Sequence, residues 1–132
     1  MGRMVTPLDI FSGFSVDDID AARTFYRDTL GLDVTDGPMG NLDIALPTGS
    51  HVFVYPKPDH QPATFTILNL VVADIDAAVD DLNARGVATA IYDDENLPTD
   101  EKGVLRGRSQ NRGPDIAWFR DPAGNVLSVL QD

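Results

Sequence analysis

The segment VDDIDAARTFYRDTLGL, from Val16 to Leu32, begins with a heptapeptide that the chain repeats. The second copy, VADIDAA, extends from Val72 to Ala78 and differs only at its second residue. In both copies an Asp precedes apolar residues spaced three or four apart, which is typical of an amphipathic helix with an Asp N-cap. The expected cap is Asp17 or Asp18 in the first copy and Asp74 in the second. Gly31 and Gly86 follow at the places where these helices should end. The repeat therefore predicts a duplicated module.

Both copies occupy the same place in an expected series of one strand, one helix and three further strands. A proline-rich linker, PKPDHQP at residues 56–62, separates them, because proline lacks the N–H that a central strand needs. We expect modules at about residues 8–56 and 63–132 within one domain covering residues 1–132. The expected strands are 8–16, 32–35, 42–46 and 51–55 in the first module, and 64–72, 87–92, 116–119 and 126–130 in the second, with a long polar loop at 93–110.

Each module is too small to bury both its sheet and its helix alone, so the two modules should pack together. The expected fold is α+β, with two βαβββ modules forming a curved mixed sheet. Helices would cover one face of this sheet and leave an open cleft on the other. Such a cleft is the natural place for a small-molecule ligand.

The 132-residue chain has a net charge of −11 and no cysteine. This charge opposes binding to nucleic acid and to anionic membrane surfaces, because both depend on Lys and Arg neutralising phosphates. Without cysteine there are no disulfides and no thiolate ligands for zinc or iron–sulfur clusters. No apolar run approaches the ~20 residues of a membrane span, and no signal-like segment opens the sequence. We expect a cytoplasmic protein that binds neither nucleic acid nor membranes.

Three segments resemble the vicinal oxygen chelate superfamily, which includes glyoxalase I, bleomycin-resistance proteins, fosfomycin-resistance enzymes and extradiol dioxygenases. They are VDDIDAARTFYRDTLGL, VADIDAAVDDLNARGV (Val72 to Val87) and FRDPAGNVLSVLQ (Phe119 to Gln131). The resemblance covers both modules and implies the glyoxalase/bleomycin-resistance-like fold described above. It also implies a homodimer, since relatives often pair. It does not select one activity, because this scaffold hosts isomerases, dioxygenases, thiol transferases and binding proteins.

In metal-using members, four ligands facing the cleft come from the first and last strands of each module and are usually His, Gln or Glu. The resemblance places these positions at Phe11, Val54, Ile67 and Ser128. Zinc, nickel, iron and manganese need imidazole or carboxylate donors where thiolates are absent. None of the four residues provides one, and moving each position by one residue yields no His, Asp or Glu. We therefore expect no metal and no cofactor.

The same positions indicate a binding function. Asn69 lies two residues after Ile67 and should share its face, and Trp118 is a candidate to join Phe11 in the cleft. Such a cleft would bind a planar or apolar molecule by stacking and burial, with Asn69 and Ser128 as hydrogen-bonding groups. The expected function is a metal-independent small-molecule binding protein of the bleomycin-resistance type. The expected ligand-binding residues are Phe11, Val54, Ile67, Asn69, Trp118 and Ser128.

Two other functions stay open. A glyoxalase-like lyase or dioxygenase-like enzyme would need unplaced residues, such as His51, Glu101 or Asp115, to reach the cleft. A partner subunit with a vestigial cleft would instead depend on its dimer surface. Arg106 and Arg108 could hold a carboxylate or phosphate of a ligand, or pair with nearby acids at the surface.

The variant Ser128→Glu should not bind zinc tightly. A single carboxylate does not make a zinc site when Phe11, Val54 and Ile67 offer no further donors. The zinc content per chain after dialysis should equal that of the wild type. Tight zinc binding by this single variant would show that the other three positions are misplaced.

Overall fold

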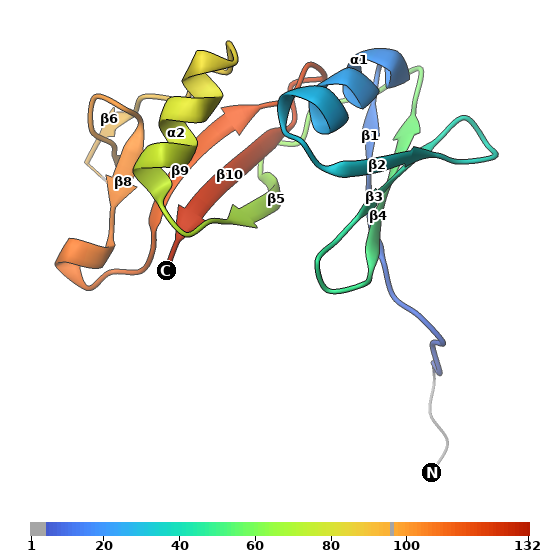
Figure 1. Cartoon of the computed structure of the whole chain (residues 1–132), viewed down its shortest axis with the longest axis horizontal. Coiled ribbons are helices and arrows are strands. Elements are labelled where there is room, and N and C mark those ends of the chain that lie inside the picture. The colour runs from blue at the N-terminus through green and yellow to red at the C-terminus, as the bar shows by residue number, and fades with distance from the viewer. Residues whose placement is uncertain (1–4, 96) are drawn as a thin grey trace. The chain divides into compact units, whose positions relative to one another are not determined.

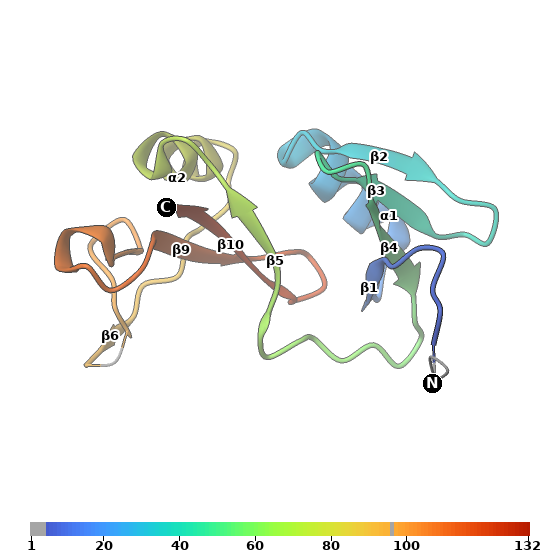
Figure 2. The same cartoon turned by 90° about the horizontal axis from the view of Figure 1, so that it is seen from below.

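The structure, a computed structural model, describes residues 5–95 and 97–132. The chain divides into two compact units, one up to His60 and one from Gln61 onward, and the boundary lies within the proline-rich linker. Each unit contains a four-stranded mixed sheet, with helical segments in the same unit (Figures 1 and 2). The α+β class and the two modules are therefore confirmed. That both modules form one domain stays a prediction.

The first unit follows the expected strand–helix–three-strand order. Its sheet has the order β1-β4-β3-β2, in which β1 and β4 are parallel and the other neighbours are antiparallel. A π-helical segment, η1, continues the first helix. The elements are β1 (Ser12–Val16), α1 (Ile19–Arg23), η1 (Thr24–Thr29), β2 (Asp33–Asp36), β3 (Leu42–Ala45) and β4 (His51–Pro56).

The second unit has the same strand arrangement, with the order β5-β10-β9-β8 and a parallel β5/β10 pair. It adds a short hairpin, β6–β7, and a single 3-10 turn, η2. The elements are β5 (Thr66–Val71), α2 (Ile75–Ala84), β6 (Asp93–Asp94), β7 (Leu97–Pro98), β8 (Val104–Arg106), η2 (Arg108–Gln110), β9 (Asp115–Arg120) and β10 (Val126–Gln131).

The repeated heptapeptides form equivalent helix starts. The Asp18 carboxylate accepts hydrogen bonds from the backbone N–H of Asp20 and Ala21, at 3.0 and 3.1 Å. The Asp74 carboxylate accepts one from the N–H of Ala77, at 3.1 Å. These bonds satisfy N–H groups that have no partner within the helix. The Asp N-caps predicted from the repeat are thus confirmed.

In each unit, one face of the sheet packs under the helical segment and forms the core. In the second unit, Phe119 and Leu127 face each other across the β9/β10 pair and are nearly inaccessible to solvent, as is Val79 of α2. Figures 1 and 2 show α2 lying across this sheet. Side chains alternate between the two faces of a strand, so residues adjacent to the core residues point to the uncovered face. We call this uncovered side the open face.

The predicted strand at 87–92 is wrong. In the described part of the chain, this segment makes a single backbone hydrogen bond to the sheet, from the Ala90 N–H to the Trp118 carbonyl, at 2.8 Å. β8 (Val104–Arg106) takes the edge position instead, paired with β9. The polar loop predicted at 93–110 therefore contains the β6–β7 hairpin, β8 and η2. Hydrophobic alternation in 87–92 could not show that a later segment competes for the same edge.

A buried turn joins β9 to β10. Asp121 and Asn125 are 5% and 2% exposed. The Asp121 carboxylate accepts hydrogen bonds from the backbone N–H of Asn125 at 2.8 Å and from its side-chain amide at 3.1 Å. Asn125 Oδ1 accepts from the N–H of Ala63, at 3.0 Å, and so ties the turn to the segment before β5. Gly124, with φ of +85°, supplies the left-handed residue that the turn needs.

Replacing Asn125 with Ala should lower the free energy of unfolding by about 1–3 kcal/mol, because buried polar groups of Asp121 and Ala63 lose their partner. Urea unfolding followed by circular dichroism measures this. Asn83→Ala, at an exposed position of α2, is the matched control and should change stability little. Equal effects of the two variants would contradict a structural role for the turn.

Candidate functional site

Three of the predicted binding residues come together on the open face of the second sheet. Ser128 is the direct strand partner of both Trp118 and Asn69. The Ser128 hydroxyl is fully buried and donates a hydrogen bond to Asn69 Oδ1, at 2.6 Å. The Trp118 indole N–H donates to Thr66 Oγ1, at 3.2 Å, which fixes the ring against β5. This face therefore offers one large aromatic ring beside a polar pair.

Ile67 lies in β5 at an irregularity of the β5/β10 pair. Val126 is opposite Thr66, whereas the next residue, Leu127, is opposite Leu68. Ile67 is thus the bulged residue that has no strand partner, and its side chain is half-buried. A bulge changes where a side chain points, so counting residues back from the helix cap did not fix the orientation of Ile67.

Phe11 lies in the first unit, just before β1, where it is half-exposed. Its ring stacks on His51 with centroids 4.4 Å apart and lies 6.4 Å from Phe53. The Phe53 ring is in turn 5.7 Å from that of Tyr55. In β4, His51, Phe53 and Tyr55 alternate with the buried Val52 and Val54. The row of rings therefore lies on the open face of the first sheet.

The prediction that Val54 faces the open side is wrong. Val54 is completely buried and pairs in register with Phe14, whose ring is 5.7 Å from that of Tyr26 in η1. It therefore belongs to the core beneath the helical segment. The alternation in HVFVY could have shown this, because its β-branched apolar residues are the ones that point inward. Aligning HVFVY with NVLSV displaced the position by one residue.

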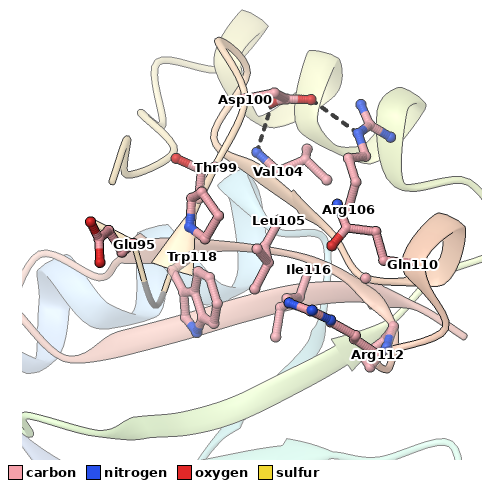
Figure 3. A pocket seen from close by; sticks show the side chains of 13 residues that line it. Glu95, Thr99, Asp100, Val104, Leu105, Arg106, Gln110, Arg112, Ile116 and Trp118 are labelled. Atoms are coloured by element: carbon pink, nitrogen blue, oxygen red, sulfur yellow. Dashed lines mark hydrogen bonds and ion pairs between the residues drawn. The ribbon is translucent and has the colours of Figure 1, made fainter. Parts of the chain in front are cut away.

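A pocket of about 740 Å³ lies in the second unit (Figure 3). Leu105, Ile116 and Trp118 line it from β8 and β9, and Leu105 pairs directly with Ile116. Since Ile116 and Trp118 alternate with the buried Ala117, this apolar floor lies on the open face. The polar lining comes from Arg106 of β8 and from the connections that flank β8: Glu95, Thr99, Asp100, Gln110 and Arg112. Among the residues that line this pocket, only Trp118 was predicted as a ligand-binding residue.

Local hydrogen bonds hold the wall of the pocket beside Trp118. Thr99 Oγ1 accepts from the N–H of Tyr92 at 2.7 Å and donates to its carbonyl at 3.0 Å. The Tyr92 ring packs edge-on against Trp118, with centroids 5.9 Å apart. Together these contacts restrict the position of the indole and keep the site preformed.

The two arginines predicted as possible ligand anchors are bound to acids of the protein. Arg106 donates to both Asp76 oxygens, at 2.7 and 3.0 Å, and to Asp100 at 3.0 Å. Hydrogen bonds from Arg106, then from Lys102, hold the pKa of Asp76 well below its usual value of 3.8. The Arg108 guanidinium nitrogen Nη1 lies 3.9 Å from Asp115 Oδ2. The geometry thus supports the surface-pairing interpretation rather than ligand recognition.

The residues at the family's ligand positions do not fit a divalent metal ion. Phe11, Val54 and Ile67 offer no donor atom, and the hydroxyl of Ser128 already donates to Asn69. Across residues 5–95 and 97–132, no three His, Asp or Glu side chains gather as a potential metal site.

Two of the residues considered for an enzyme, Glu101 and Asp115, lie in the second unit but are not among the residues that line this pocket. Asp115 shares the buried face of β9 with Ala117, and its carboxylate accepts a hydrogen bond from the backbone N–H of Arg108, at 3.0 Å. Glu101 is exposed at the turn before β8. His51 stacks on Phe11 in the first unit and lies 3.9 Å from Asp43.

The chain belongs to the Glyoxalase/Bleomycin resistance protein/Dioxygenase superfamily, whose family model matches residues 9–129. It is similar to a superfamily member from Sphaerobacter thermophilus DSM 20745, with 23% identity, a TM-score of 0.68 and coverage of 98% of this chain and 100% of that one. No curated protein matches.

Two further solved structures resemble the chain. TnmS3, an antibiotic binding protein from Streptomyces sp. CB03234, is 25% identical, with 98% of each chain covered and a TM-score of 0.65. Lactoylglutathione lyase from Agrobacterium tumefaciens is 20% identical, with 95% of this chain and 94% of that one covered and a TM-score of 0.62. The lyase likeness shows the shared fold alone.

The contribution of Asp76 to stability should depend on pH. Because its pKa is lowered in the folded state, its contribution is present above the ordinary value of 3.8 and is lost as pH falls below it. Asp76→Asn should therefore be less stable than the wild type at neutral pH, and the difference should shrink in acid. Urea unfolding from about pH 7 to about pH 2 measures this.

The control is Asp81→Asn. In the wild type, the Asp81 carboxylate pairs with Arg85, the C-cap residue of α2. The control variant's loss of stability at neutral pH should be smaller, because such a pair on a helix surface contributes little. A destabilisation by Asp76→Asn that stays constant down to the lowest pH would contradict the charge-based account.

Proposed function

We propose that this protein is a metal-independent small-molecule binding protein that holds an apolar or aromatic molecule on the open face of its second sheet. The observation that carries the proposal is the pocket of about 740 Å³ floored by Leu105, Ile116 and Trp118. This volume is in the range of pockets that bind small organic molecules. An apolar floor with polar groups at its edge is typical of small-molecule binding sites. The indole supplies both apolar area and a flat surface for stacking.

The neighbourhood of Trp118 supports binding rather than metal chemistry. Ser128 occupies the position where, by the family resemblance, a carboxylate would bind metal, yet its hydroxyl is buried and bonded to Asn69. The pair can orient a polar group of a ligand through the remaining hydrogen-bonding capacity of the Asn69 amide. TnmS3, which is described as an antibiotic binding protein, provides a precedent for binding on this scaffold.

The protein is proposed to form a homodimer and to act in the cytoplasm, with a small molecule as its partner rather than nucleic acid. The net charge of −11 supports the last point, because phosphate backbones repel an acidic surface. No helix in the described part of the chain is long and apolar enough to cross a membrane.

The test uses naphthalenemethanol, an uncharged aromatic probe, with calorimetry for affinity and NMR for location. Trp118 is the only tryptophan, so a shift of the single indole N–H signal on titration places the probe at this pocket. Trp118→Ala should weaken binding about tenfold or more, since the indole provides most of the aromatic surface there. The control Met39→Ala, at an exposed position of the first unit, should bind like the wild type.

The proposal would be wrong if the protein purified with stoichiometric zinc, nickel or iron. Binding of the probe without any change in the Trp118 indole signal would place the binding site elsewhere. An affinity that Trp118→Ala leaves unaltered would contradict the role of this pocket.

A further inference from the structure

Arg112 differs from the other basic residues that the structure describes. The side chains of Arg23, Arg27, Arg85, Lys57 and Lys102 pair with Asp carboxylates, as do those of Arg106 and Arg108. Arg120 donates to the Gly124 carbonyl. Among the described lysines and arginines, Arg112 alone has a side chain with no hydrogen bond or ion pair to another described residue. In a chain with 21 acidic and only 10 basic residues, such a cation is unexpected.

The pocket gives the free guanidinium a place to act. Arg112 and Arg106 both line it, but the Arg106 guanidinium is bound to Asp76 and Asp100. Figure 3 shows Arg112 on the Ile116 side of the apolar floor. A guanidinium offers a planar set of donors that matches a carboxylate, and it also stacks on aromatic rings. Next to an apolar floor it can hold the anionic group of an otherwise apolar molecule.

The backbone around Arg112 is fixed by its turn. The Arg112 N–H donates to the Gly107 carbonyl at 2.9 Å, and the preceding Asn111 adopts a left-handed conformation with φ of +56°. Gly107 itself has no room for a side chain, because a Cβ atom there would lie 2.5 Å from the Pro114 carbonyl oxygen. The turn therefore presents Arg112 from a defined point on the pocket wall.

Glu95 supplies a second directional feature. It also lines the pocket, and Figure 3 shows it on the Trp118 side, away from Arg112. A carboxylate there repels an anionic group of the ligand, whereas the guanidinium attracts it. Opposite charges on the two sides of one apolar floor would orient a ligand that has one charged end.

We infer that the ligand of this pocket is an aromatic or apolar molecule with a carboxylate or similar anionic group, bound with that group at Arg112 and its ring system over Ile116 and Trp118. This inference rests on the proposed function and defines its ligand class. It assigns ligand recognition to Arg112, a residue outside the family's ligand positions, and assigns orientation to Glu95.

The test compares three probes that share one ring system: naphthoate, naphthalenemethanol and naphthylmethylammonium. Calorimetry at about 50 mM salt gives their affinities for the wild type, because low salt preserves partly exposed ion pairs. Naphthoate should bind about fivefold to tenfold more tightly than naphthalenemethanol, and the ammonium probe should bind most weakly. Binding of naphthoate should also shift the Trp118 indole N–H signal.

Two variants separate charge from folding. Arg112→Met keeps an apolar stem and the backbone bond to Gly107, and it should lower the affinity for naphthoate about fivefold to tenfold, to that of naphthalenemethanol. Glu95→Gln should strengthen naphthoate binding about twofold to threefold, because it removes a repulsive charge at a solvent-exposed position. Retained binding of naphthalenemethanol shows that each variant is folded.

The outcomes distinguish the two proposals. If naphthoate and naphthalenemethanol bind the wild type equally, or if Arg112→Met keeps the preference, the anionic ligand class is wrong and the binding function stands. If no probe shifts the Trp118 indole signal, both the binding function and the ligand class are wrong. A preference for naphthoate that Arg112→Met abolishes supports both.

Discussion

The arrangement of the second sheet depends on the buried hydrogen bonds between Asp121 and Asn125 in the β9–β10 turn. These bonds fix where β9 ends and β10 begins, and so they set the register that pairs Ser128 with Trp118. Side chains alternate in a strand, so a shift of one residue would bring Ser128 to the core and expose Leu127. The bond from Ala63 extends the same control to the start of β5 and thus to Asn69. One turn thereby specifies both the packed face and the open face.

The sequence predicted the features that depend on local chemistry. The helix starts at Asp18 and Asp74, the helix ends near Gly31 and Gly86, and the α+β modules follow from caps, glycines and apolar spacing. The wrong predictions have separate causes. Segment 87–92 has strand-like residues, but β8 occupies the edge of the sheet. The open-face position assigned to Val54 came from an alignment rather than from alternation, and Ile67 falls on a bulge that no local pattern announces.

The predicted site was recovered in part for the same reason. Asn69, Trp118 and Ser128 come together because they share one face of paired strands, which period-two alternation captures. The pocket wall could not be derived in this way, because Glu95, Thr99 and Arg112 reach it through irregular connections. The sequence also could not show that Arg106 is paired with carboxylates whereas Arg112 is not. Only the packing of α2 against the sheet shows that Asp76 binds Arg106, while Arg112 is left without a carboxylate.

Much of the polar lining of the pocket comes from segments of the second module that the repeat does not explain. In the first module, β2 begins two residues after Gly31, whereas in the second module the β6–β7 hairpin lies between Gly86 and β8. The added segment contributes Glu95 and Thr99, and the connection from β8 to β9 contributes Gln110 and Arg112. The duplicated framework supplies the rigid apolar floor, whose identity is constrained by folding. The charged groups stand on connections that can change without loss of the sheet. Ligand selectivity in this protein should therefore be encoded mainly in these two connections, and the capacity to bind an apolar ring in the strands themselves.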